Sequence, residues 1–119
     1  MELGHSGDVA RLKASPERDE LLRVLQELEA LLRKWEEDRW ADWIDRDRRL
    51  IADGHPDALG HLLAAFGGAG SLRDLTIHPA NGHAIEESRM RPVNDRLRTL
   101  RGAAFTMATA LRPDEHLSP

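Results

Sequence analysis

The sequence contains no cysteine and no tyrosine, and its aromatic residues are three tryptophans and two phenylalanines. The absence of cysteine excludes disulfide bonds, thiolate chemistry and cysteine-ligated zinc fingers. No apolar run approaches the roughly 18 residues that a membrane-spanning helix requires. Residues 1–14 also lack the apolar stretch of a secretory signal. We therefore expect a cytoplasmic protein that does not enter a membrane.

Length and charge limit the function further. The 119 residues suit one small domain, and 40% hydrophobic with 32% charged residues is typical of a globular protein. The net charge of −4 is uneven, because residues 1–60 carry −5 and residues 61–119 carry +1. A mildly acidic chain without a basic stripe or interleaved aromatic residues makes nucleic-acid binding unfavourable.

Helical periodicity is clear in the first half of the chain. Ser15-Pro16-Glu17 has the cap, proline and acidic residue of a helix start. The leucines and Trp35 that follow at three- and four-residue spacing predict a core-facing helix over 15–36. A rotated apolar stripe from Trp40 to Ile51 predicts a second helix that ends at Gly54. We place a bend at 36–38, although one continuous helix over 16–53 is an alternative.

A short third helix and a long last helix complete the pattern. Pro56 opens the short helix, and Gly67 stops it. Residues 67–91 carry little periodicity, with weak strand character at 75–77. The last helix is expected from Val93 to Leu111, because the residue before Pro92 is biased away from helical geometry. The prediction is an all-α fold: a small bundle of about four helices with a long glycine-rich connection before the last helix. The single helical domain spans 15–112, with flexible tails at 1–14 and 113–119.

The glycine-rich segment 67–71 is the first candidate binding element. It lacks the Gly-Lys-Ser/Thr of a P-loop and the third glycine of a dinucleotide loop, and it follows a helix rather than a strand. A helix stop and turn is the favoured interpretation. The alternative is an anion-binding nest of successive backbone amides, with Arg73 adding positive charge.

Two features in the second helix and just before it invite a functional interpretation. Trp35, Trp40 and Trp43 are expected in the core, with an exposed Trp40 as an anchor for a partner as the alternative. Asp47 falls in the middle of the apolar stripe, where a charge needs a partner or water. We expect it to accept amides of the glycine-rich segment or to pair with Arg73, unless the stripe meets solvent there.

No catalytic or metal-binding set is readable. The six histidines lack the usual ligand spacings, so no metal and no cofactor is expected. Ser71, Asp74 and His78 could be imagined as a hydrolytic set, but they lie in a segment where spacing does not fix geometry. The prediction leans against an enzyme and assigns no catalytic residue.

The central part of the chain resembles an uncharacterised family of small bacterial proteins, a domain of unknown function. The matching residues are Trp40-Ala41-Asp42-Trp43-Ile44, Ile51 with Gly54, and a run from Leu62 to Leu75 that contains Phe66-Gly67-Gly68-Ala69-Gly70-Ser71-Leu72-Arg73-Asp74. The family more often has methionine at the position of Ala69 and asparagine at that of Arg73. The resemblance implies no activity. Families of this style often include immunity proteins that neutralise toxins, which is an analogy of style.

These observations favour a small protein-binding module, with an immunity- or antitoxin-like role as the version to test first. One alternative is a small-ligand binder or enzyme that uses the glycine-rich loop 67–78, and another is a homodimeric structural module. The predicted partner is another protein, and a homodimer is possible. The predicted binding surface consists of Trp40, Asp47, Gly68, Gly70, Ser71, Arg73 and Asp74.

Overall fold

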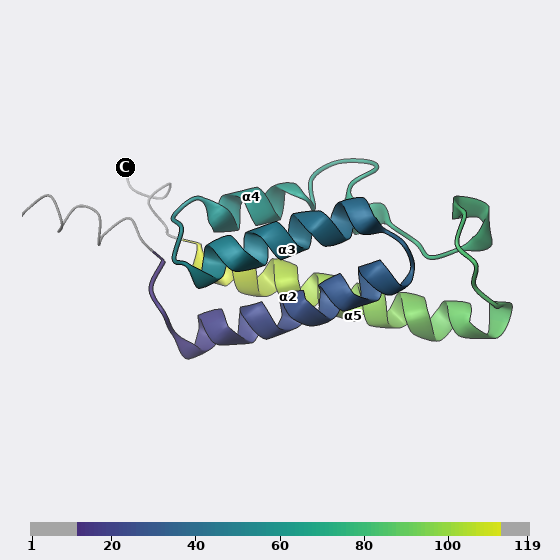
Figure 1. Cartoon of the computed structure of the whole chain (residues 1–119), viewed down its shortest axis with the longest axis horizontal. Helices are drawn as coiled ribbons and strands as arrows, with labels where there is room; N and C mark the ends of the chain where they lie inside the picture. The colour runs from purple at the N-terminus through teal and green to yellow at the C-terminus, as the bar shows by residue number, and fades with distance from the viewer. Residues whose placement is uncertain (1–11, 113–119) are drawn as a thin grey trace, which may run out of the picture.

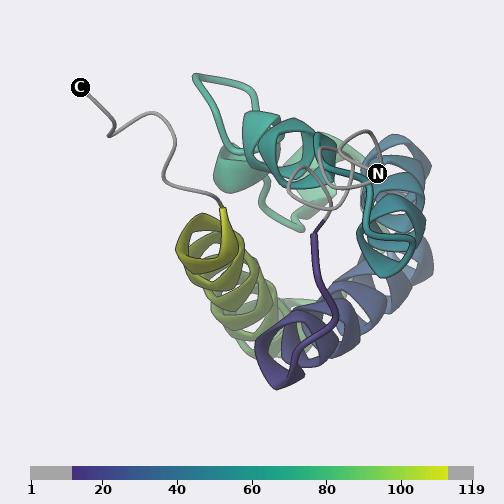
Figure 2. The ribbon, with the colours of Figure 1, turned by 90° about the vertical axis from the view of Figure 1, so that its left-hand side faces the viewer.

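The computed structural model describes residues 12–112, which form four α-helices and two short 3-10 helices without a strand. The α-helices are α2 (Pro16–Lys34), α3 (Asp38–Ala52), α4 (Ala58–Ala64) and α5 (Glu87–Leu111). They run alternately up and down, and the end-on view places α2, α3, α4 and α5 in order around the bundle (Figures 1 and 2). The predicted small all-α bundle is confirmed.

Local signals fix the ends of α2 and α3. The side chain of Ser15 accepts a hydrogen bond from the Arg18 amide at 3.0 Å, and Pro16 occupies the first helical turn, as predicted. Glu36 then adopts a left-handed backbone conformation with φ 62°. This break separates α2 from α3, so the alternative of one continuous helix is wrong. After α3, Gly54 has φ 78° and turns the chain towards α4.

The core forms where the apolar faces of the helices pack against one another. Leu21, Leu25, Leu28 and Leu32 of α2 are completely buried, as their spacing predicts. The other helices and the long connection add buried side chains from each face, namely Ile44, Ile51, Leu62, Leu72, Ile77, Leu97 and Leu100. Each such side chain contributes about 1.5–3 kcal/mol of transfer free energy, so this single core accounts for the packing of all four α-helices.

The long connection between α4 and α5 is more ordered than its sequence suggests. It contains the 3-10 helices η1 (Leu72–Asp74) and η2 (Pro79–Asn81), and η2 lies at the end of the molecule where α5 begins (Figure 1). The backbone of Ile77 pairs with a side chain instead of a strand. Asn94 Oδ1 accepts from the Ile77 amide at 2.8 Å, and Asn94 Nδ2 donates to the Ile77 carbonyl at 2.9 Å. Asn94 Nδ2 also donates to the Met90 carbonyl, so one residue holds the connection against α5.

The start of α5 corrects one prediction. The helix begins at Glu87 rather than Val93, with Pro92 inside it. Proline removes one backbone donor and leaves the Ser88 carbonyl without its helical partner. Ser88 is exposed and so available to water, while Met90 packs against the core. Tertiary packing therefore overrides the local bias of the residue before proline.

The predicted tails lie mostly outside the described residues. Only residues 12–14 of the predicted tail 1–14 are described. Leu12 is half-buried against the core, and its amide donates to the Gly54 carbonyl at 3.0 Å. Nothing among residues 12–112 is both long and apolar enough to form a membrane-spanning helix.

Candidate functional site

The glycine-rich segment is closed by its own carboxylate. Gly68 and Gly70 have φ of 80° and 76°, a left-handed conformation that favours glycine. The Gly70 amide donates to Asp74 Oδ2 at 3.0 Å, and the Leu72 amide donates to the Ala65 carbonyl at 2.9 Å. The amide of Gly70, which the predicted anion nest would need, is thus already engaged. The favoured interpretation as a helix stop and turn agrees with this geometry.

Beside this segment lies a groove that combines two distant parts of the sequence. Its volume is about 300 Å³, and we call it the arginine groove after its three guanidinium groups. Its lining residues come from the turn after α4, from η1 and from the middle of α5: Phe66, Arg73, Arg98, Arg101, Gly102 and Phe105. The Phe66 and Phe105 rings meet edge to face with centroids 5.5 Å apart. An aromatic surface bordered by cations is therefore open to solvent.

Phe105 distinguishes this groove from the rest of the surface. Its side chain is 46% exposed, and no other large hydrophobic residue among residues 12–112 is classed as exposed. Phe66 beneath it is only 5% exposed and belongs to the core. Gly102 on the same helix leaves open space, because a Cβ built there meets no atom within 4 Å. The Phe105 ring therefore packs on Phe66 on one side and is exposed to solvent on the other.

Charge in the groove is unevenly compensated. Arg101 Nη1 donates to the carbonyls of Leu72 at 3.2 Å and Leu75 at 2.8 Å, which ties α5 to η1. Burial lowers the pKa of the Arg101 guanidinium, the charge of Arg98 lowers it further, and the Asp74 carboxylate opposes both effects. Arg101 is therefore a half-buried cation whose positive field is only partly cancelled.

The other two guanidinium groups face solvent. Arg98 pairs with Asp95 at 2.8 Å on the exposed side of α5. Arg73 is exposed and forms no ion pair within the part of the chain that the structure describes. Exposed pairs such as Arg98–Asp95 contribute about 0.2–1 kcal/mol and exchange readily. Both groups are thus available to a carboxylate supplied from outside.

The acidic first half of the chain does not form a comparable free surface. Carboxylates and guanidinium groups of α2 and α3 alternate in a network across the two helices. Glu29 contacts Arg33 at 3.1 Å and Arg48 at 3.4 Å, and Asp45 contacts Arg48 at 2.6 Å and Arg49 at 2.8 Å. Much of the negative charge counted in the sequence is therefore neutralised within the molecule.

Asp47 has a different partner from those predicted. It is completely buried, and its Oδ1 and Oδ2 lie 2.7 and 2.9 Å from His61 Nδ1 of α4. The predicted pairing with Arg73 or with the glycine-rich amides is wrong, because α3 presents Asp47 to α4. Burial raises the pKa of Asp47, while the hydrogen bond and charge of His61 and the charge of Arg46 oppose that rise.

His61 is held on two sides. Trp43 stacks on the imidazole with centroids 4.7 Å apart and an interplanar angle of 22°, and its Nε1 donates to the His61 carbonyl at 3.3 Å. With Asp47 ionised, His61 Nδ1–H donates to the carboxylate. No hydrogen bond joins His61 to a hydroxyl group within residues 12–112. The pair links α3 to α4 and lacks an assembled nucleophile.

The remaining predicted residues are dispersed. Trp40 is only 8% exposed, with its ring centroid 5.5 Å from that of Trp43, so the core interpretation holds and the exposed-anchor alternative fails. Asp74 and His78 each accept a backbone amide, from Gly70 and Ala80 respectively. Ser71 Oγ is buried without a hydrogen-bond partner in the described structure. Of the predicted binding residues only Arg73 lines the groove, while Gly68, Gly70, Ser71 and Asp74 form the turn beside it.

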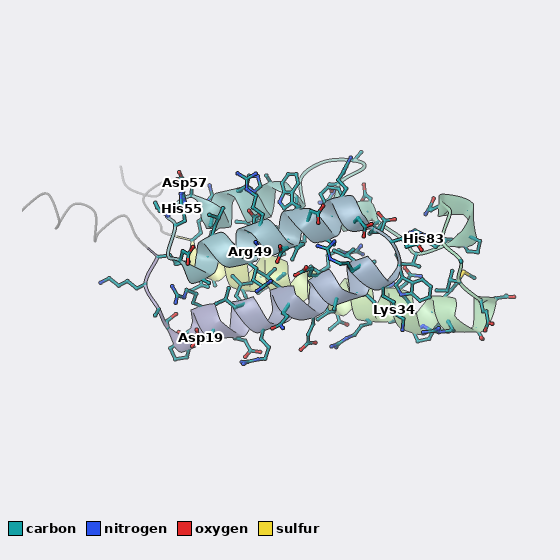
Figure 3. The ribbon with its side chains drawn as sticks, in the orientation of Figure 1. Asp19, Lys34, Arg49, His55, Asp57 and His83 are labelled. Carbon is teal, nitrogen blue, oxygen red and sulfur yellow. The ribbon has the colours of Figure 1, made fainter. Side chains whose placement is uncertain are left out.

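A buried histidine, His83, escaped the sequence analysis. His83 Nε2 lies 2.6 Å from Glu37 Oε2, and His83 Nδ1 accepts from the His78 amide at 3.0 Å. Figure 3 shows His83 beside the turn between α2 and α3. No local signal reveals this contact, because the two residues are 46 positions apart. This contact attaches the long connection between α4 and α5 to the turn between α2 and α3.

Side chains that could bind a metal do not cluster in the part of the chain that the structure describes. No group of three or more histidine, cysteine, aspartate or glutamate side chains could hold a metal ion within residues 12–112. His61 and His83 each pair with a single carboxylate, which is Asp47 of α3 for His61 and Glu37 in the turn before α3 for His83. A stable site normally needs three or four protein ligands.

Comparison with known proteins finds one similarity, in the centre of the chain. Residues 33–86 match the family model described as domain of unknown function (DUF6966), which confirms that the chain resembles an uncharacterised domain. No curated protein and no solved structure is significantly similar to the chain. The matched residues include Phe66 and Arg73, whereas the α5 side of the arginine groove lies beyond them.

Proposed function

We propose that this protein is a binding module that recognises another protein through the arginine groove. The observation that carries the proposal is the exposure of Phe105, which is 46% accessible in a groove bordered by Arg73, Arg98 and Arg101. Exposed aromatic residues and arginine are the types most enriched where proteins bind one another with high affinity. An exposed aromatic ring also carries a solvation penalty that a partner would relieve.

The shape of the site supports a preformed surface. Phe66 supports the exposed ring from the core, and Arg101 fixes η1 against α5 through two carbonyls. A surface already in its binding geometry loses little conformational entropy on association. These contacts favour a module that docks a partner without rearrangement.

The two alternative functions have weaker support. A ligand binder or enzyme using loop 67–78 would need open amides or a connected catalytic set, but Asp74 accepts the Gly70 amide and Ser71 Oγ has no partner among the described atoms. A homodimer formed through this groove would bring two clusters of arginines together. Both alternatives remain outcomes of the test below.

An immunity- or antitoxin-like role in a bacterial cytoplasm is the version of this function to test first. It rests on the small helical bundle, on the absence of cysteine and on an exposed groove without an assembled catalytic set. Neutralising proteins of this kind act by occupying a surface of their target, which requires recognition residues and no chemistry.

The test is an affinity capture from native cells with three tagged proteins. They are the wild type, a groove variant with Phe105→Ala and Arg98→Ala, and the control Thr99→Ala, which alters an exposed residue of the same helix outside the groove. Quantitative mass spectrometry should find a stoichiometric protein with the wild type and the control. That protein should be reduced at least tenfold with the groove variant.

Three results would contradict the proposal. A partner that the groove variant retains would place recognition elsewhere. Thermal stabilisation by an anion, nucleotide or divalent metal, lost in the groove variant and with no protein captured, would favour a ligand binder. A dimer in light scattering that the groove variant converts to a monomer would favour the structural module.

A further inference from the structure

We infer that the arginine groove takes an acidic segment of the partner protein, with one apolar side chain of that segment packed on Phe105 and its carboxylates on Arg73 and Arg98. The inference rests on the proposed function and specifies the chemistry of the partner. Charge complementarity carries it, because the groove presents three guanidinium groups in a protein whose net charge is −4.

Each arginine has a distinct part in this recognition. Arg101 has hydrogen bonds to the carbonyls of Leu72 and Leu75, so its position is fixed and it supplies a permanent positive field. Arg73 is exposed at η1, and Arg98 holds only the exposed Asp95. These two can turn towards a carboxylate and bind it through both guanidinium N–H groups.

The nearby carboxylates cancel the positive charge of the groove only in part. Asp74 accepts the Gly70 amide at 3.0 Å, which directs it into its own turn. The side chain of Asp95 is 55% exposed, so its pair with Arg98 is screened by solvent. A partner carboxylate could therefore displace Asp95 from Arg98 with little loss, while Arg73 has no internal partner to lose within the described residues.

The apolar part of the groove requires the partner segment to carry an apolar side chain in addition to its carboxylates. The ring of Phe105 lies edge to face on Phe66, and the position beside it is Gly102, where a Cβ would meet no atom within 4 Å. This leaves room for one aromatic or branched aliphatic side chain against the exposed ring. A purely acidic stretch would fill the cationic border and leave the ring in water.

Other occupants fit less well. A second copy of this chain would oppose like charges at a twofold interface. A nucleic acid would meet a single cationic groove on a protein of net charge −4, which gives poor long-range attraction. A small anion would gain no contact with the Phe105 ring, the feature that most needs covering.

The test is selection from a displayed library of random 12-residue peptides. Selection uses the wild type, and counter-selection uses separate Phe105→Ala, Arg73→Glu and Arg98→Glu variants whose circular dichroism matches the wild type. We expect the enriched peptides to carry Asp or Glu on both sides of one Phe, Leu or Trp. Fluorescence anisotropy should show at least tenfold weaker binding of the best peptide to each variant.

A matched control and a salt titration complete the design. Arg91→Glu makes the same charge reversal on the exposed surface of α5 outside the groove and should change the affinity less than threefold. The affinity of the best peptide should fall as the salt concentration rises from 50 to 500 mM, because salt screens the attraction between its carboxylates and the guanidinium groups of the groove. Replacement of its apolar residue by serine should weaken binding at least tenfold.

The outcomes separate the inference from the function beneath it. Groove-dependent peptides that lack acidic residues, or that lack an apolar residue, would overturn the inference and leave the binding function standing. A library that yields no groove-dependent peptide would overturn both. Binding of a 12-nucleotide oligothymidine that the same variants abolish would overturn the inference in favour of a nucleic acid.

Discussion

The buried Asp47–His61 pair gives the sharpest test of how this bundle is held together. We consider the substitution Asp47→Ala, which removes a completely buried carboxylate that lies 2.7 Å from His61 Nδ1. A hydrogen bond to a charged group contributes about 1.5–3 kcal/mol. Two effects reduce the loss: His61 is 42% exposed, so water can solvate the freed Nδ1, and the desolvation penalty of the carboxylate disappears. We expect a net destabilisation of about 2 kcal/mol.

The same helix provides a matched control. Asp42 pairs with Arg33 at 3.0 Å, but its side chain is 73% exposed. Asp42→Ala therefore makes an identical chemical change at a solvated pair, for which about 0.5 kcal/mol or less is expected. For a domain of this size, 1 kcal/mol corresponds to roughly 4–8 °C in Tm. Asp47→Ala should lower Tm by roughly 8–16 °C and Asp42→Ala by less than about 4 °C.

Urea denaturation and thermal circular dichroism at pH 7 measure both quantities. A double-mutant cycle with His61→Ala isolates the pair, and a coupling free energy of about 1–2 kcal/mol is expected. Asp47→Ala and Asp42→Ala with equal effects, or a coupling near zero, would refute the reasoning. The carboxylate would then be held by something other than the imidazole.

Four further predictions concern pH, two glycines and the anchored connection. Because burial raises the folded-state pKa of Asp47, its ionisation opposes folding, so the stability of the wild type relative to Asp47→Asn should decline as pH rises from about 4 to 7 in urea titrations. Gly102→Ala should raise the free energy of unfolding by about 0.5–1 kcal/mol, since a helical Cβ there has open space. Gly68→Ala should lower it by about 1 kcal/mol, because φ is 80°. Asn94→Ala should lower the free energy of unfolding by about 1–3 kcal/mol, because it leaves the half-buried backbone groups of Ile77 unpaired. For each of these three substitutions, an unchanged midpoint in the denaturation curve would contradict the prediction.

Part of the candidate site was readable before the structure. Arg73 and the turn beside it were singled out from the glycine pattern, and Arg73 does line the groove. Phe105 was missed, although a signal existed: it lies next to Ala104 but off the apolar stripe of the last helix. A large aromatic residue that departs from the stripe of its own helix is expected to face solvent. The sequence could thus have predicted an exposed ring, though not what surrounds it.

Asp47 illustrates the opposite case. Its place in an apolar stripe correctly indicated a charge that needs a partner, and the carboxylate is indeed completely buried with one. The identity of that partner depends on how α3 is rotated against α4, which no local pattern encodes. Arg73 and His61 were equally available from the sequence, and only the second lies on the facing helix.

The sequence by itself determined α2, α3 and α4, the break between the first two and the buried faces of the helices. Caps, prolines, glycines and apolar spacing act within a few residues, so Ser15, Gly54 and the leucines of α2 could be interpreted directly. Only the tertiary structure decided which side chains meet. Packing of α5 against η1 assembled the arginine groove. Packing of the first turns of α5 against the core, through Met90, accompanies the extension of that helix through Pro92. These contacts join residues tens of positions apart, and their free energy depends on the relative placement of whole helices, which local sequence does not specify.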